Sequence, residues 1–338
     1  MTNPLDVYGI GNALVDIQAQ VPEIFLSRLA NEHNPGSTPI TKSAMHLVDT
    51  AFQGHLLRLL EEYDLHTVSG GSAANTMIGL AHVGCRAAYA GKVGEDIYGA
   101  FYADDMHRIG VDFSVPFGHE STGTCIVLVT PDAQRTMFTH LGISAALTSD
   151  DIDEAAIRRA QWVYIEGYLW DSPGPRAASI KAMEVAKRHG VKVAYTFSDP
   201  FCVNRARDDF AAFTRDYVDL VFCNEHEAHA FAQTDCTETA LQKIIALGTS
   251  VALTQGAKGS VIVQNGARHQ IAPVLVDPID TTGAGDLYAA GVLAGFCQQQ
   301  SIDAAGAFGA ALASQIITVR GARLPQETVA LKLANGRV

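Results

Sequence analysis

The chain has 338 residues, a formal net charge of −12 and a pI near 5.4, a length that allows two average domains or one large α/β domain with an appendage. Hydrophobic residues make up 48% of the sequence and charged residues 18%, which is typical of a globular protein and excludes a disordered chain. Because its 24 Lys and Arg residues are spread along an acidic chain, we predict no nucleic-acid partner and no membrane surface, so local groups must hold any anionic ligand.

The cysteines and the N-terminus predict a cytoplasmic protein. The six cysteines include no C-x-x-C pair, and Met1 to Asp6 lack the charged-then-apolar pattern of a signal peptide. The sequence also lacks an apolar run of the roughly 20 residues that are needed to span a bilayer. A reducing compartment without membrane insertion is therefore expected.

The first predicted strand, residues 7–17, passes through glycines and carries two polar residues, Asn12 and Asp16. It begins like a G-x-G-x-x-G motif, but Leu14 stands at the third glycine position, so dinucleotide binding is not predicted. An amide and a carboxylate in an apolar strand are costly unless they are hydrogen-bonded. A polyhydroxylated ligand would satisfy both side chains, whereas the alternative is a glycine-bearing core strand.

Two stretches interrupt the α/β pattern. Residues 18–67 are irregular, with a polar loop and a helix-like segment at 44–60, and residues 111–138 are rich in strands. We interpret both as one small β-sheet lid inserted into a larger domain. The predicted lid comprises residues 16–68 and 111–141, and the predicted large domain comprises residues 1–15, 69–110 and 142–338.

Between these stretches, Gly70 and Gly71 precede a helix of small residues. Two glycines allow the backbone to approach a ligand closely, and Asn75, one helical turn beyond Gly71, can reach the same ligand. Capping of the helix by Ser69 or Ser72 explains the same residues equally well.

From residue 162 onward, strands alternate with helices, which predicts a parallel sheet with helices on both faces. Ligands in such sheets bind at the carboxyl ends of the strands, where Asp16, Asn224 and Thr254 are expected. The expected strands are 162–165, 191–195, 220–222 and 251–254, and the expected helices are 175–189, 208–215, 225–233 and 237–247.

Asn224 and Glu227 follow one of these strands in an Asn-x-x-Glu pattern. Magnesium prefers oxygen ligands and keeps several waters, so an amide and a carboxylate one turn apart suit it, although a helix-capping box has the same pattern. His226 and His229 are three residues apart rather than four, so a zinc site is not predicted.

The most informative segment is 280–286, Asp-Thr-Thr-Gly-Ala-Gly-Asp. An apolar stretch ending at Val276 predicts a strand, and helical spacing begins directly after Asp286, so the segment opens a helix. Gly283 and Gly285 allow close approach to a phosphate on the first-turn N–H groups, and Asp286 is placed to take a proton from an attacking hydroxyl. The alternative is a glycine-rich turn whose carboxylate stabilises the helix dipole.

These segments resemble the ribokinase-like carbohydrate and nucleoside kinases, the PfkB family. Asp-Thr-Thr-Gly-Ala-Gly-Asp is similar to the C-terminal signature of that family, and Gly-Gly-x-x-x-Asn at 70–75 is similar to its other signature, in the same order. The resemblance implies an α/β protein with a three-layer α/β/α ribokinase-like fold, a central mostly parallel sheet and a small inserted β-sheet lid. It also implies ATP and Mg²⁺, and leaves open a monovalent cation such as K⁺ beside residues 280–282.

The resemblance also implies roles for individual residues. The transferring phosphates would lie on Gly283, Ala284 and Gly285, with Asp286 as the base, and Arg135 would close onto the γ-phosphate unless it forms a surface salt bridge. No Walker P-loop is found at residues 256–259. Substrate would contact Asn12, Asp16, Gly70, Gly71, Ser72 and Asn75; the nucleotide would contact Asn224, Thr254, Gln255, Gly256, Gly259 and Thr282; magnesium would lie near Asn224 and Glu227.

The substrate class is divided between two subfamilies. Gly-Asn-x-Leu-x-Asp at 11–16 resembles adenosine kinases, whereas residues 135–142 resemble bacterial sugar kinases. A purine could stack on Cys125, Met137 and Tyr168, and packing of the lid and core explains these residues equally well. We therefore predict phosphorylation of the 5′-hydroxyl of a nucleoside, adenosine in the first instance, by a monomer or homodimer, with a free sugar or sugar acid as the alternative substrate.

Overall fold

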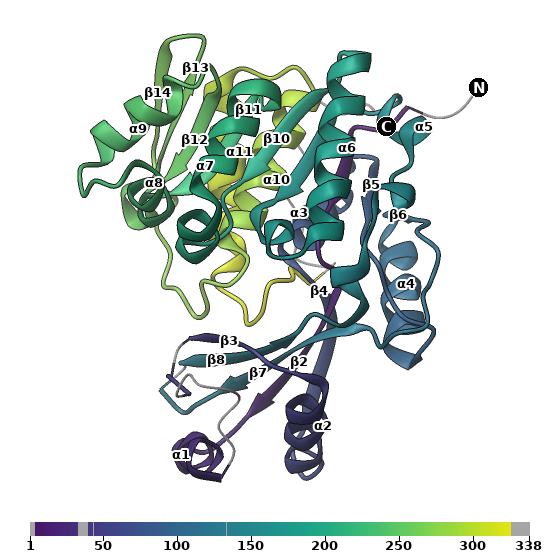
Figure 1. The fold of residues 1–338 in the computed structure, drawn as a ribbon. Helices are drawn as coiled ribbons and strands as arrows, with labels where there is room; N and C mark the ends of the chain where they lie inside the picture. The colour runs from purple at the N-terminus through teal and green to yellow at the C-terminus, as the bar shows by residue number, and fades with distance from the viewer. Residues whose placement is uncertain (1–3, 33–39, 43, 133, 326–338) are drawn as a thin grey trace.

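The computed structural model describes residues 4–32, 40–42, 44–132 and 134–325. Its larger sheet has nine strands in the order β14-β13-β12-β11-β10-β9-β1-β5-β6 (Figure 1). The strands from β12 to β6 are parallel, and β13 and β14 are antiparallel to their neighbours. The strands are β1 (Val7–Ile10), β5 (Ala87–Ala90), β6 (Asp112–Phe113), β9 (Trp162–Glu166), β10 (Lys192–Thr196), β11 (Leu220–Asn224), β12 (Ser250–Thr254), β13 (Ser260–Gln264) and β14 (Ala267–Ile271).

Helices cover both faces of this sheet, and each face has its own core. One core joins the sheet to α3 (Ser72–His82), α4 (Ile97–Ile109), α10 (Ala284–Cys297) and α11 (Ile302–Ile316). The other joins it to α6 (Pro173–His189), α7 (Pro200–Tyr217), α8 (Glu225–Ala232) and α9 (Thr237–Ile245), with the short α5 (Glu154–Ile157) beside α6. The predicted three-layer architecture and the α/β alternation from residue 162 are confirmed.

The second sheet lies beneath the first in Figure 1 and has the order β3-β8-β7-β2-β4. On one face, alternate residues such as Ile17 and Ile126 share the main core with Leu29 of α1 and Leu56 of α2. The elements are β2 (Leu14–Gln20), β3 (Met45–Leu47), β4 (Leu65–Gly70), β7 (Gly123–Val129), β8 (Arg135–His140), α1 (Glu23–Glu32) and α2 (Thr50–Leu59).

The strand assignments shift the edges of the predicted lid by a few residues. β2 already begins at Leu14 and β4 continues to Gly70, whereas β6, which falls in the predicted lid segment 111–141, pairs with β5 of the large sheet. That the second sheet forms a separate moving domain stays a prediction.

Three elements differ from the sequence-based expectation. The strand predicted at residues 7–17 is divided into β1 of the large sheet and β2 of the second sheet, so Asp16 lies within β2 rather than at the carboxyl end of a strand of the large sheet. The apolar stretch ending at Val276 forms no strand within the described residues 272–282, and Leu275 is 77% exposed. The backbone that follows this stretch contacts the C-cap of α11 instead, where Ile279 N donates to Ile317 O at 2.7 Å. The helix-like segment 44–60 contains β3 and then α2, because Asp49 ends the extended chain and caps α2 through a bond from Phe52 N.

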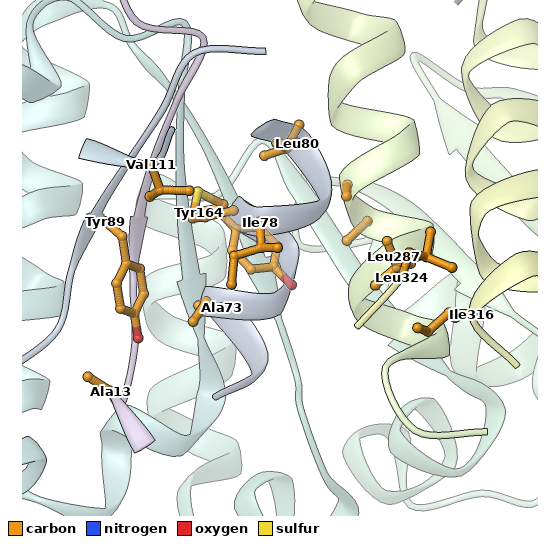
Figure 2. Packing of buried hydrophobic residues seen from close by; sticks show 14 of the residues in the cluster. Ala13, Ala73, Ile78, Leu80, Tyr89, Val111, Tyr164, Leu287, Ile316 and Leu324 are labelled. Atoms are coloured by element: carbon orange, nitrogen blue, oxygen red, sulfur yellow. The ribbon is translucent and has the colours of Figure 1, made fainter. Parts of the chain in front are cut away.

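Helix α3 positions the site because it is packed between the large sheet and α10 (Figure 2). Gly79 permits the close approach of α10, since a Cβ at this position would lie 2.9 Å from atoms of Ala290 and Leu287. The first turns of α3 and α10 therefore lie side by side at the carboxyl edge of the sheet. Among the described residues, the helices are too short or too polar to cross a lipid bilayer.

Candidate active site

Asp286 lies in the first turn of α10, and two side chains of α3 hold its carboxylate. Ser72 Oγ donates to one oxygen of Asp286 at 2.7 Å, and Asn75 Nδ2 donates to the other at 3.0 Å. Gly71, which has no side chain, is the N-cap residue of α3, so the alternative in which Ser69 or Ser72 serves as the cap is wrong. The two sequence motifs therefore meet at one carboxylate.

The protonation of Asp286 suits acid–base chemistry near neutral pH. Burial raises the pKa of Asp286 from 3.8 to about 6, and the hydrogen bonds from Ser72 and Asn75 offset part of that rise. The carboxylate is thus ionised at neutral pH and is more basic than an exposed aspartate. These are the properties of a general base.

The two glycines before Asp286, Gly283 and Gly285, lie in different surroundings. Gly283 adopts φ 76°, and a Cβ there would lie 3.0 Å from Ala322 Cα, so the turn requires glycine. Gly285 is exposed, and a Cβ there would meet no heavy atom of the described residues within 4 Å. It faces open space beside the first-turn N–H groups of α10, which lack intrahelical partners and favour an anion.

Two adjoining cavities meet at this turn, and Gly285 and Ala284 line both. The first is apolar, has a volume of about 370 Å³ and is bounded by residues 273–276 and by α11. The second has a volume of about 460 Å³ and contains Asp286. The polar residues of the second cavity include Ser72, Asn224, Glu227, Thr254 and Gln255.

Asn224 and Glu227 form a capping box that also lines the polar cavity. Asn224 Nδ2 donates to Glu227 Oε1 at 2.6 Å, and Glu227 N donates to Asn224 Oδ1 at 2.9 Å. Burial raises the pKa of Glu227 to about 7, although the backbone N–H of Asn224 lowers it. The capping and ligand-binding interpretations are therefore compatible, because one buried carboxylate can serve both.

The remaining predicted nucleotide residues lie around the two cavities. Thr254 and Gly256 line both, and Gly259 lines the apolar one. Gln255 lines the polar cavity and donates from Nε2 to Glu225 at 3.0 Å. Gly259 has φ 89°, and a Cβ there would lie 2.2 Å from Ile271 O, so its glycine serves the turn between β12 and β13.

The glycine pair at 70–71 accommodates Asp16 of β2 and Asn12 of the segment between β1 and β2. A Cβ on Gly70 would lie 2.4 Å from the Asp16 carboxylate, and one on Gly71, which has φ 101°, would lie 2.2 Å from Asn12 O. Burial raises the pKa of Asp16 to about 6, while the positive charge of Arg135 lowers it. The structure thus brings the predicted sugar-binding residues next to the turn that begins α3.

Glu166 was missed by the sequence-based reasoning. It ends β9, is 1% exposed, and accepts bonds from Asn12 N at 2.7 Å, Asn12 Nδ2 at 3.2 Å and Ala73 N at 2.8 Å. Burial raises its pKa to about 7, although these donors lower it. Glu166 therefore fixes Asn12 to the first turn of α3.

The predicted purine contacts are only partly brought together. Cys125 and Met137 pack with Val127 and Val129 on the face of the second sheet that also carries Asp16, which pairs with Cys125 in register. Tyr168 packs against the other core, and its hydroxyl donates to Ser198 O at 3.4 Å. It does not belong to the Cys125 cluster.

Arg135, the first residue of β8, and Thr282 lie together beside the turn that begins α10. Arg135 Nη1 donates to both oxygens of Asp280, at 2.8 and 2.9 Å, and also to Thr282 Oγ1. The Arg135 side chain is 16% exposed, so the predicted alternative of a surface salt bridge gives way to a largely buried pair. Its predicted contact with a γ-phosphate stays a prediction.

Comparison with known proteins identifies the family. The pfkB family carbohydrate kinase profile matches residues 53–329, which is most of the chain. The chain belongs to the PfkB family. This confirms the resemblance inferred from the two motifs, and it makes the protein a phosphotransferase that acts on an alcohol group with ATP.

Relatives of this PfkB kinase include both nucleoside and sugar kinases. Adenosine kinase of Saccharomyces cerevisiae is 29% identical over 97% of this chain and 99% of its own. The crystal structure of adenosine kinase from Sinorhizobium meliloti is 36% identical, with a TM-score of 0.85 over 95% of this chain and 96% of that one. A probable sugar kinase from Rhizobium etli is 35% identical, with a TM-score of 0.86 over the same shares.

A magnesium ion fits this PfkB kinase as a companion of the nucleotide phosphates. Among the described residues, no group of three His, Cys, Asp or Glu side chains could hold a metal by itself. The polar cavity nevertheless offers oxygen donors from Asn224 and Glu227, the ligand type that Mg²⁺ prefers while it keeps waters and phosphate oxygens. These two residues would hold the ion, which supplies charge neutralisation when bound.

Proposed function

We propose that this PfkB kinase transfers the γ-phosphoryl group of ATP to the 5′-hydroxyl of adenosine. The observation that carries the proposal is the end-to-end similarity to adenosine kinases, which extends through the second sheet as well as the large sheet. The apolar cluster of Cys125, Val127 and Val129 beside Asp16 supports it, because a purine offers a surface of matching polarity and a small free sugar does not.

The roles of the residues follow from their positions. Asp286 removes the proton of the 5′-hydroxyl while that oxygen bonds to the γ-phosphorus and the bond to the β-phosphate oxygen breaks. Ser72 and Asn75 orient the carboxylate of Asp286. The N–H groups of the first turn of α10 stabilise the charge on the transferring group. Asn12 and Asp16 hold the ribose hydroxyls, and the apolar cavity lined by residues 273–276 takes the adenine of ATP.

The substrate assay compares adenosine, 2′-deoxyadenosine, ribose and fructose on one enzyme preparation. Adenosine should give the highest kcat/KM, and 2′-deoxyadenosine should fall at least about tenfold below it, the loss expected when one buried polar group is left unpaired. The similarity to a probable sugar kinase makes a free sugar the second candidate. If ribose or fructose exceeds adenosine in kcat/KM, the nucleoside proposal is wrong and the sugar-kinase alternative stands.

A further inference from the structure

A largely buried ion pair joins the second sheet to the loop that precedes α10. Arg135 is the first residue of β8, and Asp280 begins the loop that leads to Asp286. The Arg135 side chain is 16% exposed and that of Asp280 is 8% exposed, with 2.8 Å between Nη1 and Oδ1. Removing one partner of a pair that is this well shielded from water costs more than breaking a surface salt bridge, because it leaves a buried charge unpaired.

Asp280 also ties two further backbone segments to the same point. Its Oδ1 accepts from Thr282 N at 3.0 Å, and its Oδ2 accepts from Gly321 N at 2.8 Å. Burial would raise the pKa of Asp280, but the N–H groups of Gly321 and Thr282 and the charge of Arg135 hold it below its usual value. The carboxylate is therefore ionised, and each of its two oxygens already accepts from the Arg135 guanidinium and from a backbone N–H group.

Two backbone oxygens beside the loop are also engaged. Ile317 O accepts from both Ile279 N, at 2.7 Å, and Asp280 N, at 3.2 Å, and Thr281 O accepts from Ala284 N at 3.3 Å. A monovalent cation beside this loop would have to compete with these donors and with the guanidinium for the same oxygens. A K⁺ ion bound through the Asp280 carboxylate therefore does not fit these residues, because both of its oxygens accept from Arg135 and from a backbone N–H group.

We infer that Arg135 is the built-in cation of the Asp280 loop, so that this kinase needs no added monovalent cation to shape the turn on which phosphate binds. Because the guanidinium belongs to the second sheet, the shape of the turn depends on where that sheet lies. Arg135 is in this sense a positioning residue that acts through Asp280. The inference rests on the proposed function of the α10 turn as the phosphate site.

The cation requirement is the first test. Activity of the wild-type enzyme should agree within about twofold in potassium chloride and in choline chloride at equal ionic strength, because the Arg135 charge is always present. The Arg135→Ala variant should lose at least about tenfold in choline chloride and recover part of that loss when K⁺ or methylguanidinium is added. A tenfold or larger activation of the wild type by K⁺ overturns the inference.

A double-mutant cycle separates this role from a direct contact with phosphate. If Arg135 acts through Asp280, Arg135→Ala should cost at least about tenfold in the wild-type background but less than about twofold in an Asp280→Asn background. Equal losses in both backgrounds would show that Arg135 acts on the nucleotide independently, which overturns the inference. Arg205→Gln is the matched control, since it removes an Arg–Asp pair with Asp171 at 2.7 Å elsewhere on the molecule.

Amide hydrogen exchange tests the inference without any substrate. The N–H groups of Thr282 and Gly321 should exchange at least about tenfold faster in Arg135→Ala than in the wild type and should be unaffected in Arg205→Gln. Unchanged exchange at both amides overturns the inference. Because this measurement needs neither adenosine nor ATP, its result stands even if adenosine proves not to be the substrate.

Discussion

At the scale of single residues, Asp286 combines the properties expected of the base, since it is ionised at neutral pH and oriented by Ser72 and Asn75. We predict that Asp286→Asn lowers kcat by roughly 10²–10⁴ and leaves the KM for the alcohol substrate within a few-fold, because a general base acts on the transition state. Steady-state kinetics of both enzymes measure this. An unchanged kcat would remove Asp286 from the mechanism.

The dependence of kcat/KM on pH tests the role of Asp286 as the base in a second way. With a pKa of about 6, Asp286 is protonated below that pH, so kcat/KM should fall about tenfold per pH unit as the pH decreases from 6. Glu227 has a pKa raised to about 7 at the same cavity, so the acidic limb belongs to interacting groups rather than to Asp286 alone. A rate that is constant down to pH 5 contradicts the assignment.

Glu166 supports a separate prediction at this scale. Glu166→Gln replaces an acceptor oxygen with an N–H₂ group, so at least one of the bonds to Asn12 and Ala73 is lost. We expect the KM for adenosine to rise about tenfold while the KM for ATP changes less than about twofold, because we propose that Asn12 holds the alcohol substrate. Glu184→Gln, at an exposed position of α6, is the control. Equal increases in both KM values would indicate general disruption.

The sequence carries a signal for Glu166. Its carboxylate directly follows the apolar strand 162–165, and burial there requires hydrogen-bond partners, as it does for Asn12 and Asp16. Asn75 and Asp286 were predictable because each belongs to a spaced motif. Their contact with each other was not, because it depends on the packing of α3 against α10, which no local pattern encodes.

At the scale of elements, the start of α10 carries a prediction that separates binding from folding. Gly285→Val adds side-chain atoms where a Cβ meets no heavy atom of the described residues within 4 Å, and these atoms project beside both cavities. We expect the KM for ATP to rise at least about tenfold with little change in the thermal midpoint, and Gly285→Ala to be intermediate. A lowered midpoint with unchanged KM would mean that Gly285 serves the fold instead.

The elements themselves were predicted to very different degrees. The sequence predicts a helix after each glycine-containing motif, and both helices are confirmed. Helix α10 begins at Ala284, before the helical spacing that starts after Asp286. The apolar run ending at Val276 has the composition of a strand, yet it lines a cavity with Leu275 exposed. Composition cannot distinguish a strand that is buried in a sheet from a segment whose apolar side chains line a cavity.

At the scale of the whole molecule, the two sheets bring acidic groups to one edge. Burial raises the pKa values of Asp16 and Asp286 to about 6 and those of Glu166 and Glu227 to about 7. Such groups favour binding of substrate and metal but destabilise the substrate-free protein when they are ionised. The stability of the whole molecule should therefore depend on the protonation of these four carboxyl groups.

This reasoning predicts an inverted dependence of stability on pH. A carboxyl group whose pKa is raised by folding holds its proton in the folded state at pH values where the unfolded chain has released it, so stability falls as the pH rises through that window. For Asp286 and Glu227 the window runs from 3.8 and 4.5 in the unfolded chain to about 6 and 7 in the folded protein. The substrate-free enzyme should therefore have a higher thermal midpoint at pH 5.5 than at pH 8.

The variants separate this effect from the general repulsion of a chain with a net charge of −12. Asp286→Asn should raise the midpoint at pH 8 and change it much less at pH 5, because only the ionised wild-type carboxylate is destabilising. Asp208→Asn removes the same charge from a side chain that is 93% exposed and should leave the midpoint nearly unchanged at both pH values. If the two variants shift the midpoint equally, net charge is the cause; if the wild-type midpoint rises steadily from pH 5.5 to pH 8, the buried carboxyl groups do not govern stability.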